Sequence, residues 1–89
     1  MTWKIKFLAE AEKELKQLGR PVVQRILRFL NERIRLLEDP RKIGEPLKGP
    51  KLGKYWKYRV GDYRIICQIK ESEIIILVVR VGYRKEIYR

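Results

Sequence analysis

The sequence predicts an α+β fold of the order β-α-α-β-β-β, in which a helical hairpin packs on a mainly antiparallel sheet. Three observations support this fold class. Residues 2–8 alternate between apolar and charged side chains, residues 9–37 place apolar side chains at helical spacing, and residues 54–81 contain three apolar runs separated by short turns. A length of 89 residues suits one domain covering residues 1–89, with no linker or repeat.

The first three elements follow from the spacing of apolar residues. Lys4 and Lys6 alternate with apolar neighbours, which predicts a half-buried first strand. The first helix then runs to Gly19, a favoured residue just past a helix end. Pro21 opens the second helix and Asp39-Pro40 ends it. The apolar stripe of this second helix consists of Val22, Ile26, Phe29, Leu30, Ile34 and Leu37.

The second half of the chain is predicted to be a loop followed by three strands. Residues 41–53 hold three glycines and two prolines, which is typical of a loop. The strands are expected at 54–60, 63–70 and 73–81. The last of them is continuously apolar and is therefore predicted to be a central strand covered on both faces.

The net charge of the chain limits the classes of partner that it is expected to bind. Twenty-two Lys and Arg face eleven Asp and Glu, a net charge of +11. Residues 41–64 alone carry eight basic and two acidic side chains. This concentration in a loop and a hairpin favours a polyanionic partner such as nucleic acid. The alternative is a basic surface that serves only solubility.

The remaining composition indicates a cytoplasmic protein without a membrane segment. Cys67 is the single cysteine, so an internal disulfide is excluded and a reducing compartment fits. Lys4 and Lys6 interrupt any signal-peptide pattern. The longest apolar run, residues 74–79, is too short to span a bilayer.

The hairpin "KYWKYRVGDYRIICQI", residues 54–69, has a register that its turn should fix. If Gly61-Asp62 is a two-residue loop, Arg59 pairs with Arg64 and Tyr58 pairs with Ile65. One face then collects the core residues Trp56, Tyr58, Val60, Tyr63, Ile65, Cys67 and Ile69. The other face collects Tyr55, Lys57, Arg59, Arg64 and Gln68.

Like charges placed opposite each other destabilise a sheet, so the Arg59–Arg64 pair calls for an explanation. An anion bound between the two guanidinium groups would provide one. The alternative is that their long stems cover apolar neighbours while the charged heads spread into water.

The residue types limit the chemistry at such a site. The chain has no histidine, Cys67 is predicted to be buried, and no carboxylate cluster or Gly-rich phosphate loop indicates a metal or nucleotide cofactor. Arginine, lysine and tyrosine remain. These can grip a phosphodiester and stabilise the charge that develops during its transfer. A metal-free reaction that uses the 2′-hydroxyl of RNA is therefore accessible, whereas DNA lacks that hydroxyl.

Two stretches, "YRVGDYRIICQI" and "VRVGYRKEIYR", together with "PLKG" before the hairpin, resemble the RelE family of toxins from toxin–antitoxin modules. The resemblance covers nearly the whole chain. It implies a RelE-like fold related to microbial ribonucleases and a ribosome-dependent endoribonuclease, an mRNA interferase that cleaves mRNA in the A site. Cleavage would need no metal and no cofactor, because attack by the 2′-hydroxyl gives a 2′,3′-cyclic phosphate.

The resemblance also implies roles for individual residues. Arg64 matches the arginine that stabilises the scissile phosphate, Arg84 the arginine that helps protonate the leaving oxygen, Tyr88 the general base, and Lys57 a lysine on the ligand face. Tyr55 stands where the family has a second lysine, and Lys54 or Arg59 would compensate. The other candidate RNA-binding residues are Lys48, Lys51 and Lys85.

The implied partners are a RelB-like acidic antitoxin, mRNA in the ribosomal A site and 16S rRNA, with operator DNA bound only through the antitoxin complex. Two other functions stay open: a ParE-type inhibitor of DNA gyrase, and a non-catalytic binder of nucleic acid or ribosomes. Tyr88 as a packed terminal aromatic and Arg84 as a solvated tail cation are the simpler interpretations of those residues. The sequence leaves the orientation of Arg80 undecided.

Overall fold

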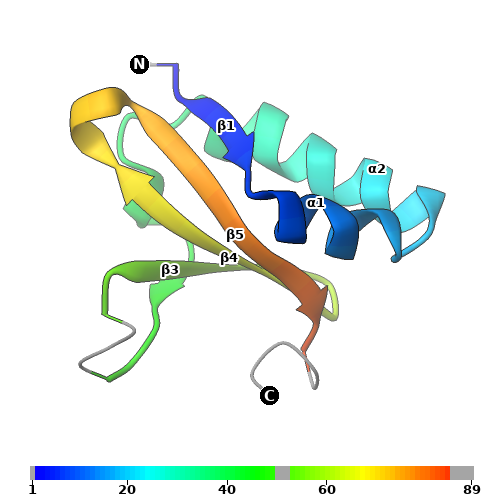
Figure 1. Cartoon of the computed structure of the whole chain (residues 1–89). Coiled ribbons are helices and arrows are strands. Elements are labelled where there is room, and N and C mark those ends of the chain that lie inside the picture. The colour runs from blue at the N-terminus through cyan, green and yellow to red at the C-terminus, as the bar shows by residue number, and fades with distance from the viewer. Residues whose placement is uncertain (1, 50–52, 85–89) are drawn as a thin grey trace.

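A computed structural model of the chain describes residues 2–49 and 53–84. A five-stranded sheet has the order β1-β5-β4-β3-β2, with β1 parallel to β5 and every other pair antiparallel (Figure 1). The predicted α+β class and its mainly antiparallel sheet are confirmed. The α-helices and strands are β1 (Lys4–Phe7), α1 (Ala9–Lys16), α2 (Arg20–Arg28), β2 (Glu45–Pro46), β3 (Tyr55–Val60), β4 (Tyr63–Lys70) and β5 (Ile75–Tyr83), and two short 3-10 helices cover Pro40–Lys42 and Glu71–Glu73.

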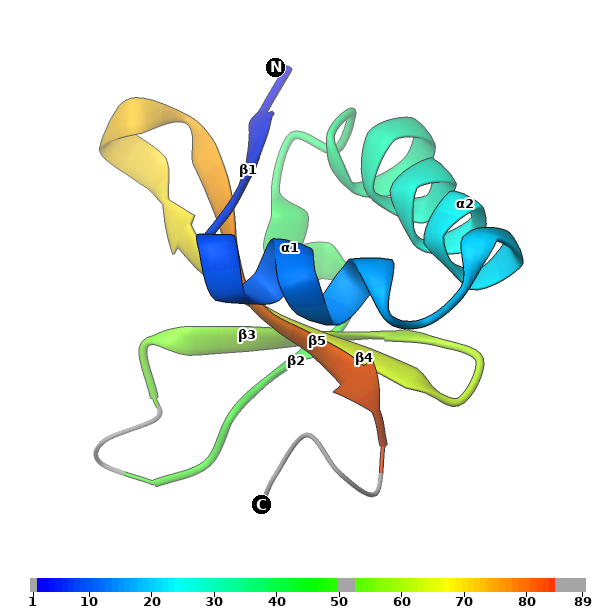
Figure 2. The same ribbon diagram turned by 45° about the vertical axis from the view of Figure 1, so that its right-hand side comes forward.

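Both helices lie on the same face of the sheet (Figure 2). The core forms between them from fully buried aliphatic and aromatic side chains, because each element brings one apolar face to this layer. The helical segments contribute Ala11, Leu15, Ile26, Leu30 and Ile34. The sheet contributes Tyr58, Val60, Ile65, Cys67, Ile76, Val78 and Val81, and Trp3, directly before β1, completes the core.

The second helix keeps its predicted apolar stripe but changes its winding. After Arg28 the chain continues as a π-helical segment, Phe29–Ile34, in which the Arg35 N–H donates to the carbonyl of Leu30 at 2.9 Å. This wider turn keeps Leu30 and Ile34 in the core with Ile26. The predicted single helix is therefore two helical segments of different pitch.

The β3–β4 hairpin has the predicted register. Val60 pairs with Tyr63 and Arg59 with Arg64 across the two-residue turn at Gly61 and Asp62. Gly61 has φ +60, a value that a two-residue hairpin turn requires and that glycine adopts without strain. The predicted core face is also confirmed, since its seven residues are buried or half-buried.

Strand β5 is central, as predicted, but it contains an irregularity that the sequence did not reveal. Cys67 pairs with Val78 whereas Ile66 pairs with Arg80, so β5 has one extra residue, a β-bulge. The bulge shifts the alternation of side chains between the two faces of β5. Val78 and Val81 therefore both lie in the core, although they are an odd number of residues apart. The prediction that both faces of this strand are covered holds only partly, because the side chains facing away from the helices are half-buried.

Residues 41–53 were expected to be only loop, and this was wrong at Glu45 and Pro46, which form the short edge strand β2 against β3. Gly44, directly before it, has φ +83, and a Cβ built there would lie 2.4 Å from the carbonyl oxygen of Lys57. A glycine at this position therefore lets the chain pass close enough to pair with β3.

No helix within residues 2–49 and 53–84 has the length and apolar character needed to cross a membrane.

Candidate nucleic-acid interface

The cations of the β3–β4 hairpin lie on the sheet face opposite the helices. Lys57, Arg59 and Arg64 alternate with core residues of the same two strands, and Arg59 and Arg64 are direct cross-strand partners. Gly82 of β5 pairs with Arg64 on its other side. The row across the sheet is thus two arginines and a glycine, and the glycine adds no side chain beside Arg64.

Arg64 is far less exposed than its charge suggests. It was predicted to share a solvent-facing surface with Arg59, yet its exposed fraction is only 9 % while Arg59 is exposed. Its Nη1 donates to the carbonyl oxygens of Tyr63 at 3.1 Å and Gly61 at 3.3 Å. These bonds turn the guanidinium toward the hairpin turn and hold it there. The fixed geometry is what a group that stabilises a developing charge requires.

The end of β5 reaches the same turn. The backbone N–H of Arg84 donates to the carbonyl of Asp62 at 2.9 Å, and Tyr63 and Tyr83 form an edge-to-face pair with ring centroids 5.9 Å apart. Arg84 is exposed and lies two residues beyond Gly82, the partner of Arg64. The fold therefore brings Arg84 to the end of the hairpin that carries Arg59 and Arg64.

Lys57 has a carboxylate partner that the sequence analysis did not foresee. Its Nζ lies 3.2 Å from Oε1 of Glu45, the residue opposite it in the β2–β3 ladder, and the Lys57 side chain is 21 % exposed. The hydrogen bond and charge of Lys57, with smaller effects of Arg59 and Lys48, hold the pKa of Glu45 below its usual value. Any anion that binds Lys57 must share it with Glu45.

We expect the pKa of Glu45, followed by NMR of its side-chain carboxyl carbon, to lie below 4.5, the usual value for glutamate, and to return toward it in Lys57→Met. A carboxyl whose pKa is lowered by folding stabilises the native state above its unfolded pKa, and this contribution disappears as the pH falls through the folded pKa. Wild type should therefore lose more stability on acidification than Glu45→Gln. An unchanged Glu45 pKa in Lys57→Met would contradict the assigned ion pair.

Tyr55 and Lys54 lie at the opposite end of β3. Tyr55 pairs with Gln68, and the Nζ of Lys54 sits 5.2 Å from the centroid of the Tyr55 ring, a cation–π arrangement. At about 3.3 Å per strand residue, Tyr55 is roughly 13 Å along β3 from Arg59. The fold does not bring the tyrosine into the arginine pair. The exposed Lys54 and the half-buried Tyr55 ring form a separate cationic position.

The other predicted residues are more dispersed. Lys48 is exposed in the loop between β2 and β3, near enough to Glu45 to lower its pKa. Lys51, Lys85 and Tyr88 lie outside the described residues.

Arg80, whose orientation the sequence left undecided, is held at the edge of β5 by α1. Its Nη2 lies 2.9 Å from Oε2 of Glu14, whose Oε1 accepts the backbone N–H of Val81 at 3.1 Å. Strand β1 pairs with β5 only up to Val78, so Glu14 satisfies an N–H of the edge that β1 leaves open. Arg80 therefore has a structural partner on the helical side.

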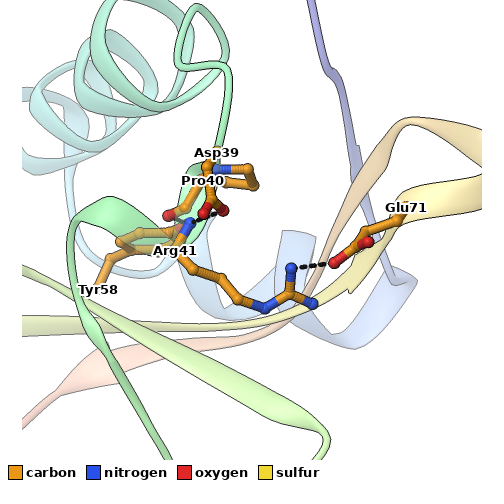
Figure 3. Close-up of polar contacts among 5 residues, drawn as sticks. All are labelled: Asp39, Pro40, Arg41, Tyr58 and Glu71. Carbon is orange, nitrogen blue, oxygen red and sulfur yellow. Dashed lines mark hydrogen bonds and ion pairs between the residues drawn. The ribbon is translucent and has the colours of Figure 1, made fainter.

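A buried phenol fixes β3 to the preceding segment. The Tyr58 hydroxyl donates to the Pro40 carbonyl at 2.6 Å, the Asp39 carboxylate accepts the Arg41 N–H at 2.9 Å, and Arg41 pairs with Glu71 (Figure 3). Burial, then the neighbouring Cys67, raises the pKa of Tyr58.

Burial alone raises the pKa of the Cys67 thiol. Neither Tyr58 nor Cys67 is therefore available as a base or nucleophile at neutral pH. The buried structural cysteine expected from the sequence is confirmed.

One family model and two relatives place the chain among known proteins. It matches the family described as the ParE toxin of the type II toxin–antitoxin system, parDE, over residues 5–88. It is 30 % identical to the mRNA interferase toxin RelE of Escherichia coli K12, over 99 % of this chain and 92 % of that protein. It is 26 % identical to the toxin RelG of Mycobacterium tuberculosis, over 100 % of this chain and 99 % of that protein.

A solved structure agrees with the fold. The RelBE2 toxin–antitoxin complex of Mycobacterium tuberculosis contains a chain that superposes with a TM-score of 0.84 at 21 % identity, covering 97 % of this chain and 95 % of that one. With the family match over nearly the whole sequence, these similarities establish that the chain is a toxin of a type II toxin–antitoxin system and belongs to the RelE/ParE family.

Proposed function

We propose that this toxin is a ribosome-dependent endoribonuclease that cuts mRNA in the ribosomal A site and thereby stops translation in the cytoplasm. The observation that carries the proposal is the Arg59–Arg64 pair on a rigid hairpin, with Arg64 held by two turn carbonyls. Paired guanidinium groups fit a phosphodiester, which can accept two parallel N–H bonds from one arginine. The relative named mRNA interferase supports the same activity.

The proposed reaction is a transfer of the phosphodiester within the RNA. The 2′-oxygen forms a bond to phosphorus, the bond from phosphorus to the 5′-oxygen breaks, and a 2′,3′-cyclic phosphate remains. The 2′-hydroxyl gives its proton to a base, for which Tyr88 is proposed, and the leaving 5′-oxygen gains a proton with the help of Arg84. Arg64 stabilises the negative charge that grows on the non-bridging oxygens. No step requires a metal.

Lys57 contributes a point charge two residues along β3 from Arg59. Because Glu45 already neutralises part of that charge, Lys57 is suited to orienting the backbone rather than to carrying the main stabilisation. The candidate RNA-binding residues Lys54, Tyr55 and Lys48 would contact nucleotides farther from the scissile bond. Lys51 and Lys85 are proposed for the same role from the sequence alone.

The proposed partners follow from charge and family. Membership of a type II system predicts an antitoxin, and a chain of net charge +11 favours an acidic, RelB-like one. The mRNA and 16S rRNA of the A site are the proposed nucleic-acid partners. Operator DNA would be bound only by the complex with the antitoxin.

Mapping of the 5′ ends of mRNA in a translating extract tests this function. We expect cuts within codons of translated messages on addition of the toxin, and none in the same messages when initiation is blocked. Intact mRNA in extracts whose translation has stopped would refute the proposal.

A ParE-type gyrase inhibitor is the second candidate, because the matched family is described as a ParE toxin. Loss of supercoiling activity of purified gyrase, without mRNA cuts, would favour it.

A further inference from the structure

A second cationic surface lies between α2 and the tip of the β3–β4 hairpin, on the helical side of Arg59. It is a shallow groove of about 550 Å³. Four arginines dominate its lining, with one phenyl ring and one carboxylate among them; these residues are Arg25, Arg28, Phe29, Glu32, Arg33 and Arg59. We call this surface the arginine groove.

The four arginines of the groove have no partners that would explain their convergence. Within residues 2–49 and 53–84, none of their side chains forms a hydrogen bond or an ion pair. All four are exposed, and Glu32 is the single carboxylate in the lining of the groove. Clustered guanidinium groups repel one another, and an anion bound among them would offset this repulsion.

The hairpin turn holds part of the groove in place. A Cβ built at Gly61 would lie 3.0 Å from Nη1 and 3.1 Å from Nη2 of Arg25. The Arg25 guanidinium thus rests against the turn itself, where the absence of a side chain leaves room for it. Arg25 and Arg28 lie on α2, and Arg33 follows on the π-helical segment Phe29–Ile34.

Arg59 connects the groove to the candidate cleavage site. It lines the groove and is also the cross-strand partner of Arg64. A strand whose phosphate lies at Arg64 can therefore pass Arg59 and continue along the arginines of the helix.

We propose that the arginine groove binds the phosphate backbone of RNA beside the scissile bond, as a site separate from Arg64. The choice of RNA rests on the proposed function. A guanidinium group can donate two parallel hydrogen bonds to two oxygens of one phosphate. An acidic protein helix would need an apolar stripe beneath it, whereas Phe29, half-buried against Tyr58, is the main apolar group of the groove.

The test measures binding of an RNA that cannot be cut, so that it does not depend on cleavage. Fluorescence anisotropy would follow a fully 2′-O-methylated oligonucleotide of about 12 nucleotides at several salt concentrations. The double variant Arg25→Gln/Arg28→Gln is compared with Lys4→Gln/Lys6→Gln. The control removes the same charge from two exposed lysines on β1, at the opposite edge of the sheet.

We expect the groove variant to bind about tenfold more weakly, with the slope of log affinity against log salt smaller by about 1.4, since each lost phosphate contact on a single strand removes about 0.7. The control should change the slope by much less. Arg25→Lys/Arg28→Lys should keep most of the slope but lose affinity, because lysine lacks the fork.

Equal losses in the two glutamine variants would overturn the proposal, because only net charge would then matter. Unchanged RNA binding together with weakened binding of an acidic antitoxin segment would also overturn it and assign the groove to protein. If the groove variant loses RNA binding but wild type does not cut mRNA, the groove stands and the proposed nuclease function fails.

Discussion

Arg64→Ala is expected to lower the rate of mRNA cleavage by about 100- to 1000-fold, the loss seen when one donor to a developing anion is removed. The reason is the fixed position of the guanidinium. With 9 % exposure and two turn carbonyls as acceptors, Arg64 is oriented before the substrate arrives. Alanine removes both the charge and this orientation. Single-turnover cleavage in a ribosome programmed with a short message measures the effect.

Two further variants separate charge from geometry. Arg64→Lys keeps the charge, but lysine cannot donate two parallel hydrogen bonds to one anion. We therefore expect its cleavage rate to remain at least about tenfold below that of wild type. Arg59→Ala removes the neighbouring cation, which is exposed and unpaired among the described residues. For this variant a rise in KM larger than the fall in kcat is expected, since an exposed cation that no partner orients contributes mainly to binding.

Stability must be measured in parallel, because Arg64 also has a structural role. Loss of its two bonds to the turn should lower the free energy of unfolding by about 1 kcal/mol, which a domain of this size tolerates. Folded Arg64→Ala with cleavage within about threefold of wild type, too small a change for a lost transition-state contact, would exclude Arg64 as the stabilising group.

The hairpin could be predicted from sequence because one turn determines it. Gly61-Asp62 fixes a two-residue loop, the loop fixes the register, and the register assigns each side chain to a face. The cross-strand pairing of Arg59 and Arg64 follows from these local rules alone.

Features that depend on distant parts of the chain could not be predicted. The bulge in β5 arises from pairing two strands whose apolar runs give no sign of an extra residue. Strand β2 is two residues long and one of them is proline, so it has no periodic pattern that could predict it. The Glu45–Lys57 ion pair depends on this strand and could not be predicted either. The helical spacing places Arg25 and Arg28 off the apolar stripe of α2, but only the tertiary fold sets Arg25 against Gly61.

Gly44→Ala is expected to cost about 2–5 kcal/mol of the free energy of unfolding, from two causes. A side chain at φ +83 is strained by about 1–2 kcal/mol. The added Cβ would also meet the Lys57 carbonyl oxygen at 2.4 Å, Nε1 of Trp56 at 2.7 Å and Cδ1 of Tyr58 at 2.9 Å. Relieving such overlaps costs about 1–3 kcal/mol more, because the backbone of β3 must move.

Gly49→Ala is the matched control for this prediction. Gly49 also has positive φ, +107, but no atom of residues 2–49 and 53–84 lies within 4 Å of a Cβ built there. It should lose only the conformational strain, about 1–2 kcal/mol, so urea denaturation of the two variants isolates the close approach of Gly44 to β3. Equal losses would show that the contact with Lys57 is not tight. A larger loss in Gly44→Ala should be accompanied by a Glu45 pKa that moves up toward its usual value, because β2 can no longer hold that carboxylate against Lys57.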